Sequence, residues 1–277
     1  MKIRQSIAVR LAQNTVIVVF IVVTLLPLLL MLNNSFKDRV SITRNPLALP
    51  EKPFVTNYER AWVYGKIPSA AINSICITAG TIVITVLCAS MAAYVFARRS
   101  VRGWQGFTIY FLVCNTLPKQ LIIIPLFLIL QRLKLINNIF AMMFIYGAVF
   151  TPFALFLLRT YFMGIDRDYE NSAKIDGASM WQIFMHIIFP LVQPGLLTVA
   201  IIVGLWCWNE FLFAVTFLQT EEVSTIAVRF YSFIGRYSTE WGNMMAYATL
   251  ITVPVMIFFI LLQNKFIDGM TAGGIKG

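Results

Sequence analysis

Two charged side chains stand inside long apolar stretches of this chain, where charge is costly. Lys119 interrupts one stretch, and Glu210 follows the uncharged run 177–209. A charge in hydrocarbon faces the interior of a helix bundle and marks a candidate functional site. At a rise of about 1.5 Å per helical residue, Lys119 and Glu210 would lie at similar depths in the membrane, close enough to form an ion pair. We predict that both residues, with Trp208 and Asn209, line a solute pathway or brace its gate. The alternative is that the two charges snorkel to the membrane surface, or that the boundaries of the predicted spans are wrong by a few residues.

Other residue patterns do not indicate catalysis or metal binding. No G-x-x-x-x-G-K-[ST] loop is present to cradle a nucleotide, so we do not expect this chain to hydrolyse ATP. The single histidine, His186, has no partners at metal-ligand spacing and is expected to be structural. The cysteines lack C-x-x-C spacing and lie in apolar runs, which predicts buried apolar side chains: Cys76, Cys88, Cys114 and Cys207.

The composition identifies the environment of these residues. Of 277 residues, 59% are hydrophobic and 12% are charged, whereas a soluble domain carries about 25% charged residues. Mean hydropathy is +0.78. These values exclude an ordinary soluble enzyme and indicate a polytopic membrane protein. The net charge of +10 fits loops beside anionic lipid headgroups better than nucleic acid, for which no binding is expected.

The gaps between charges predict six membrane-spanning helices. A bilayer crossing needs about 20 apolar residues, and backbone in lipid must satisfy its own hydrogen bonds. The fold class is therefore all-α. The cluster Arg98-Arg99-x-x-Arg102 favours a cytoplasmic N-terminus, and six spans would then place both chain ends on the cytoplasmic side. The predicted spans are residues 14–32, 71–96, 106–130, 139–161, 192–218 and 245–264.

The segment 164–195, here called the 164–195 loop, has the pattern of two short helices and a turn. Asp166 and Asp168 favour the first turn of a helix. Asp176-Gly177 should end that helix, because glycine adopts positive φ without steric cost.

A second short helix should follow within the same loop. Ser179 and Gln182 have capping-box spacing, which predicts a helix start. Pro190 is expected to stop that helix, and Pro194 suits the first turn of the next span.

The 164–195 loop resembles the cytoplasmic "EAA" loop of ABC importer permeases, E-A-A-x-x-D-G-A followed by an aromatic residue and P-L-x-x-P. The matching residues are Ala173, Asp176, Gly177, Ala178, Phe184, Pro190, Leu191 and Pro194. Asn171 stands at the signature Glu position, with Glu170 one residue earlier and Ser172 in place of the first Ala.

Three further sequence motifs make the resemblance more specific, and together with the loop they extend it over the whole chain. They are Leu117-Pro118 with Pro125-Leu126-Phe127, the run Trp208-Asn209-Glu210-Phe211, and the ending that starts at Asp268. Together they are similar to the shorter permease subunit of carbohydrate importers, such as the maltose/maltodextrin system.

This resemblance implies a type I importer permease fold, with residues 1–277 as one transmembrane domain and the 164–195 loop as its coupling loop. It also implies a second, related permease in a heterodimer, two copies of a cytoplasmic ABC ATPase that carries ATP and Mg, and an extracytoplasmic solute-binding protein in a bacterial cell membrane. No cofactor is expected on this chain. The residues expected at the ATPase are Glu170, Asn171, Ser172, Ala173, Asp176, Gly177, Ala178, Phe184 and Pro190.

Two other segments are expected to meet partners. The outer loop 220–243 is rich in aromatic residues, which form either an interfacial belt or a contact for the binding protein. Its candidates are Arg229, Phe230, Tyr231, Phe233, Arg236, Tyr237 and Trp241. The tail 271–277 is expected to be flexible and to reach the ATPase through Gly273, Gly274 and Lys276.

Two other function classes compete with the importer. An ion-coupled carrier working without an ATPase is the main alternative, but such carriers show paired repeats and broken helices, and no internal repeat is visible. An intramembrane enzyme or scaffold is the other, and the spans hold no nucleophile–base set. A homodimer is the alternative to the heterodimer. The sequence does not name the transported sugar.

Overall fold

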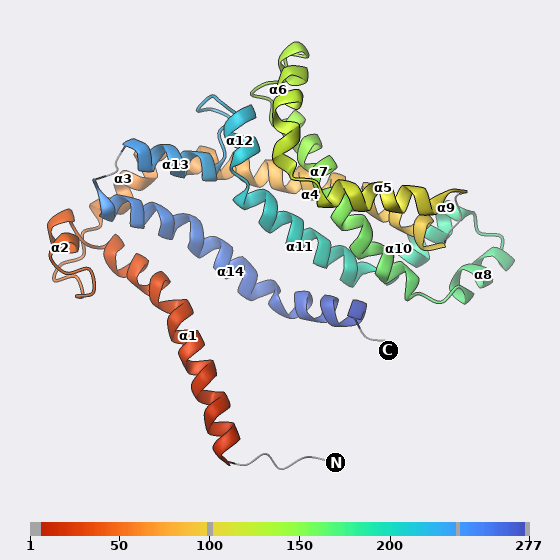
Figure 1. Ribbon diagram of the computed structural model, residues 1–277, viewed down its shortest axis with the longest axis horizontal. Coiled ribbons are helices and arrows are strands. Elements are labelled where there is room, and N and C mark those ends of the chain that lie inside the picture. Colours follow the sequence, from red (N-terminus) through yellow and green to blue (C-terminus); the bar gives the residue numbers. More distant parts are fainter. Residues whose placement is uncertain (1–6, 99–101, 237–238, 275–277) are drawn as a thin grey trace. The chain divides into compact units, whose positions relative to one another are not determined.

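The computed structural model describes residues 7–98, 102–236 and 239–274, and every regular element in these ranges is helical. Within these ranges, four helices are long and apolar enough to cross a membrane, and two bent helix pairs would raise the number of spans to six if each pair is one span. The four helices are α1 (Ile7–Ser35), α4 (Ile67–Arg98), α7 (Ile139–Met163) and α14 (Trp241–Gly274), labelled in Figure 1.

The first bent pair replaces the continuous helix predicted for 106–130, so that prediction was wrong. Helix α5 (Trp104–Thr116) ends at Leu117, and the chain resumes as η1 (Lys119–Ile122) and α6 (Ile123–Arg132), bent by 93°. Leu117 is extended, with φ −69° and ψ 136°. A proline disfavours helical backbone in the residue before it, and Pro118 therefore explains the break.

The second bent pair spans the end of the 164–195 loop and the start of the fifth predicted span. Helix α9 (Met180–Ile183) continues through a π-helical turn, η2 (Phe184–Ile188), into α10 (Phe189–Leu191) and meets α11 (Gln193–Asn209) at 73°. Pro190 was expected to stop the helix but lies within α10. Its missing N–H fits the wider turn before it, where the Phe189 N–H bonds the Phe184 carbonyl.

The fifth span also does not run unbroken over 192–218 as predicted. Helix α11 ends at Asn209, Glu210 is extended with φ −71° and ψ 126°, and α12 (Leu212–Phe217) follows. Pro194 lies in the first turn of α11, as predicted.

Contacts divide the chain into two compact units. The first comprises residues 1–67 and 230–256 and contains α1, α2 (Arg39–Arg44) and α3 (Thr56–Tyr64). Within it, the Asn57 side-chain amide donates to the carbonyls of Ser35 and Lys37 at 2.8 Å each. The Tyr247 ring packs against Phe230 and Phe233, with centroids 5.3 and 5.2 Å away. These contacts join segments that are far apart in sequence.

The second unit comprises residues 68–229 and 257–277, and α7 is its central helix. Half of the apolar window of α7 is buried, and α7 packs against α11 and α5. Gly147 allows α4 to approach α7 closely, because a Cβ there would lie 2.6 Å from Ile84 Cγ2. The largest fully buried side chains of this core are Tyr146, Phe162, Phe217, Ile77, Met142, Leu155, Leu158, Ile183, Ile188, Leu218 and Val192.

The cysteine prediction was wrong for two of the four residues. Cys207 is buried, Cys114 is intermediate, and Cys76 and Cys88 are exposed on α4. An apolar helix in a membrane protein has a face that packs inside and a face for lipid or a partner. Hydropathy does not distinguish these faces.

Candidate functional site

The 164–195 loop forms the helix–turn–helix that the sequence predicts. Helix α8 (Asp168–Ile175) ends before Gly177, whose φ is +81°. The next helix starts with a complete capping box: Ser179 Oγ accepts from the Gln182 N–H at 3.3 Å, and Gln182 Oε1 accepts from the Ser179 N–H at 2.8 Å. Positive φ and reciprocal capping make the turn well defined.

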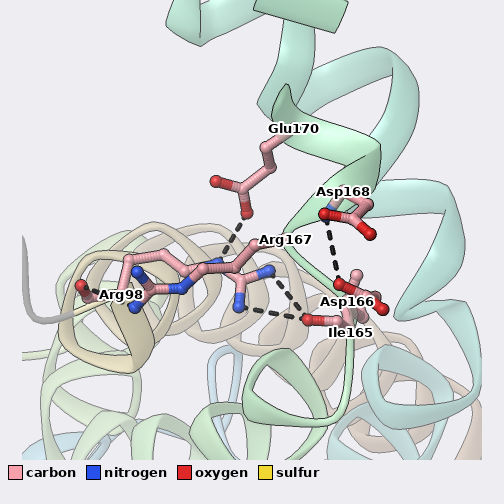
Figure 2. A network of polar contacts seen from close by, with 6 residues as sticks. All are labelled: Arg98, Ile165, Asp166, Arg167, Asp168 and Glu170. Atoms are coloured by element: carbon pink, nitrogen blue, oxygen red, sulfur yellow. Dashed lines mark hydrogen bonds and ion pairs between the residues drawn. The ribbon is translucent and has the colours of Figure 1, made fainter. Parts of the chain in front are cut away.

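A buried ion pair attaches this loop to the end of α4 (Figure 2). Arg98 Nε donates to Glu170 Oε1 at 2.6 Å, and the two side chains are only 10% and 7% exposed. The Arg98 guanidinium also donates twice to the Ile165 carbonyl at 3.2 Å. In return, Arg167 donates to the Arg98 carbonyl at 3.5 Å. Charge-assisted bonds of this kind are short and directional, so the end of α4 and the start of α8 are held together.

Aromatic packing supports the same joint. The Phe184 ring lies 5.2 Å from Tyr94 of α4 and 6.4 Å from Phe162 of α7, measured between centroids. Phe184 is buried, as are Glu170 and Ala173. These three predicted ATPase residues therefore point into the chain. The other predicted contacts are exposed, except for the half-buried Ala178: Asn171, Ser172, Asp176, Gly177 and Pro190.

Sequence reasoning missed three exposed, large apolar side chains beside the Gly177 turn of the loop. Ile175 is 86% exposed, Trp181 60% and Met180 55%. They lie at the end of α8 and the start of α9, on either side of the Gly177 turn. The available signal was the occurrence of these apolar residues within 174–181, next to the polar residues Lys174, Asp176 and Ser179. Such exposed apolar groups suit a protein–protein contact.

The predicted pathway residues gather around one cavity of about 520 Å³. Lys119, Asn209 and Glu210 line it, together with residues that the sequence analysis did not select. Trp208 does not line this cavity, whereas Trp206 does. The further lining residues are Gln120, Tyr146, Val149, Phe150, Leu205, Trp206, Leu212 and Phe213.

Lys119 and Glu210 share the cavity but have different partners. The Lys119 ammonium lies over the rings of Phe150 and Trp206, 4.7 and 5.2 Å from their centroids. The Glu210 carboxylate accepts from the Tyr146 hydroxyl and from two backbone N–H groups at the start of α12. Within the described ranges, the ion pairs of the structure do not join Lys119 to Glu210.

The outer segment contains α13 (Ile226–Arg236), and its candidate residues do not share one surface. Arg229 is buried and ion-paired with Glu221 at 3.1 Å, and Phe233 is 4% exposed. Phe230 is half-buried. Tyr231, Arg236 and Trp241 are exposed, whereas Tyr237 lies outside the described residues. A docking surface on this segment would thus exclude Arg229 and Phe233.

The remaining residues singled out in the sequence are the C-terminal glycines and lysine and the single histidine. Helix α14 continues through Gly273 and Gly274, where a flexible tail was predicted, and Lys276 lies outside the described residues. His186 lies on η2, with Nδ1 3.2 Å from the Gln182 carbonyl. In the described part of the chain, His, Cys, Asp and Glu side chains do not form a group of three or more that could hold a metal ion.

Comparisons with known proteins give a consistent result. Residues 85–272 match the family described as binding-protein-dependent transport system inner membrane component. The probable ABC transporter permease protein YurM of Bacillus subtilis (strain 168) is 35% identical over 251 residues, covering 91% of this chain and 83% of that protein. The arabinooligosaccharides transport system permease protein AraQ of Halalkalibacterium halodurans is 30% identical over 262 residues, covering 92% of each protein.

A solved structure shares the fold. It is a chain of a bacterial ABC transporter involved in the import of the acidic polysaccharide alginate, with a TM-score of 0.81 and 22% sequence identity. The match covers 96% of this chain and 99% of that chain.

Proposed function

Because this chain belongs to the family of inner membrane components of binding-protein-dependent transport systems, we propose that it is the permease subunit of an ATP-driven sugar importer. It would move an oligosaccharide or related sugar, delivered by a binding protein, through alternating access. The sugar is inferred from relatives such as AraQ and from the resemblance to carbohydrate permeases. The observation that carries the proposal is the 164–195 loop, a rigid helix pair with an exposed apolar surface.

The loop would act by docking on a cytoplasmic ATPase. Ile175, Met180 and Trp181 are exposed on its outer surface and would enter an apolar groove of that partner. Glu170 is bonded to Arg98, so Asp176 is the better candidate for an acidic contact at the interface. Small exposed groups at Ser172 and Gly177 would let the two backbones approach closely.

Movement of the loop would pass into the membrane helices through the Arg98–Glu170 pair. If α8 moved and α4 did not, the buried ion pair between them would break, which is costly. The Phe184 contacts with Tyr94 and Phe162 would transmit the same displacement to α4 and α7. This chain would therefore contribute the transmitting element and the ATPase would contribute the energy.

The remaining partners belong to the same proposal. A second, related permease would complete the pathway in a heterodimer, two ATPase copies would hold ATP and Mg, and the binding protein would dock outside, near Tyr231, Arg236 and Trp241. The C-terminal residues Gly273, Gly274 and Lys276 would extend toward the ATPase. The complex would lie in a bacterial inner membrane, and this chain would carry no cofactor and no catalytic residue.

The docking role can be tested with Ile175→Asp in the assembled complex. We expect ATP-dependent uptake to fall on the order of tenfold or more, because a charge replaces an apolar anchor in a buried contact. Co-purification of the ATPase should fall in parallel. Leu49→Asp is the matched control, since Leu49 is also an apolar side chain that is 82% exposed but lies outside the loop. Equal ATPase recovery from both variants would contradict the proposal.

A further inference from the structure

The cavity of about 520 Å³ lies where two chain segments depart from helical structure. One break is at Leu117-Pro118, before Lys119 and Gln120, and the other is at Glu210, after Asn209. Backbone that leaves its helix at membrane depth is tolerated where it is buried in protein or borders a water-filled cavity. That residues beside both breaks line the same cavity therefore points to a site that admits polar molecules.

The lining combines a partly exposed aromatic ring with polar groups that retain bonding capacity. Trp206 is 39% exposed, and its ring lies beneath the Lys119 ammonium at 5.2 Å from the centroid. Asn209 uses one amide N–H on the Leu205 carbonyl, so its other N–H and its oxygen remain. An ammonium offers three donors, and a cation–π contact uses none of them as a hydrogen bond. The cavity volume is within the range of about 300–1,000 Å³ typical of small-molecule sites.

Glu210 contributes a negative charge to the cavity, but three of its roughly four acceptor sites are used by the protein itself. Its carboxylate accepts from the Tyr146 hydroxyl and from the N–H groups of Phe213 and Ala214. These two N–H groups are at the start of α12, where helical N–H groups have no acceptor within the helix. Glu210 accepts from them and therefore acts as a helix cap. With one basic and one acidic side chain lining it, the formal charges of the cavity cancel, so the lining is matched to a ligand without net charge.

We propose that this cavity is a subsite for a neutral sugar ring, provided by this subunit itself. The Lys119 ammonium and the rings of Phe150 and Phe153 already contact Trp206, so the sugar ring would stack on the remaining exposed part of the indole. Lys119 would donate to the sugar hydroxyls, and Gln120 and Asn209 would donate to or accept from them. Sugars present an apolar face and a polar rim, which is the combination that this lining complements. The inference rests on the proposed function and adds to it that this permease contacts the solute directly.

The test is equilibrium binding to the complete transporter in detergent, without the binding protein. The probes are radiolabelled maltotriose and arabinotriose, which are neutral, and an acidic alginate trisaccharide. We expect Trp206→Leu to weaken binding of at least one neutral probe about tenfold, as for loss of an aromatic hot spot. Trp206→Phe should retain most of the affinity. Trp208→Leu is the matched control, because Trp208 is on the same helix but does not line the cavity.

Kinetics give a second readout, measured per amount of assembled complex. With saturating binding protein, Trp206→Leu should lower the maximal uptake rate and leave half-saturation unchanged, since the binding protein captures the sugar first. Equal binding by Trp206→Leu and Trp208→Leu would overturn the subsite, and so would tighter binding of the alginate probe than of both neutral probes. Failure of the wild-type complex to import any probe would contradict the proposed function. The binding measurement needs no transport and would still decide the subsite.

Discussion

At the residue scale, Arg98 and Glu170 carry the most specific expectation. Both side chains are nearly inaccessible, so Glu170→Ala would leave a buried guanidinium without its counter-charge. We expect this variant to lose about 3–5 kcal/mol of stability. The measurement is thermal denaturation of the purified complex. Glu170→Gln should lose less, since the amide oxygen still accepts from Arg98.

A double variant separates stability from coupling. Arg98→Met with Glu170→Leu replaces the pair by apolar groups, which is often neutral for stability. We expect this variant to assemble and bind ATPase normally while transporting fewer sugar molecules per ATP hydrolysed. A wild-type ratio of transport to hydrolysis would show that the pair does not transmit motion.

Asp38 gives a pH-dependent expectation at the same scale. Hydrogen bonds from Ser41 lower the pKa of this carboxyl below its ordinary value of 3.8. When the folded state has the lower pKa, the ionised carboxyl stabilises the fold at pH values above the pKa of the unfolded state. This stabilisation is lost as the pH falls through the pKa of the folded state. Protection of the α2 amides against hydrogen exchange, corrected for intrinsic rates, should therefore decrease below about pH 3.8. Asp38→Ala should remove this pH dependence.

At the element scale, the turn between α8 and α9 depends on one backbone conformation. Gly177 has φ +81°, which costs other residues about 1–2 kcal/mol. Gly177→Ala should therefore lower thermal stability and reduce coupled transport. Gly177→Asn should be milder, because asparagine tolerates this region better. Equal effects of Ala and Asn would argue against a conformational cause.

The contact between α4 and α7 gives a second expectation at this scale. A methyl group at Gly147 would lie 2.6 Å from Ile84 Cγ2, so Gly147→Ala should force the helices apart and cost about 1–3 kcal/mol. Adding Ile84→Ala should restore much of the loss. The comparison of the single and double variants in thermal denaturation checks that the clash is the cause.

At the scale of the whole molecule, the proposed function predicts that the chain is inactive without the proposed partners. Reconstituted alone in vesicles, it should neither import sugar nor hydrolyse ATP above background. Uptake should appear only when the second permease, the ATPase, the binding protein and hydrolysable ATP are all present. Solute movement by the isolated chain would instead favour a carrier that works without an ATPase.

The sequence by itself determined the features that arise from neighbouring residues. Apolar length and scarce charge predict a polytopic helical membrane protein, and the structure matches an importer permease. The Gly177 turn and the Ser179 capping box were predicted as observed. Such features depend on the backbone preference of a residue and on side chains within one helical turn, so a local pattern contains them.

Only the tertiary structure decided where side chains point and which distant residues meet. Glu170 turns inward because its carboxylate accepts a hydrogen bond from Arg98, which is 72 positions away in sequence. Trp206 lines the cavity and Trp208 does not, although both stand in one apolar run. Prolines near the bends were visible in the sequence, but angles of 93° and 73° were not. These outcomes depend on packing between helices that are distant in the chain, which no local pattern encodes.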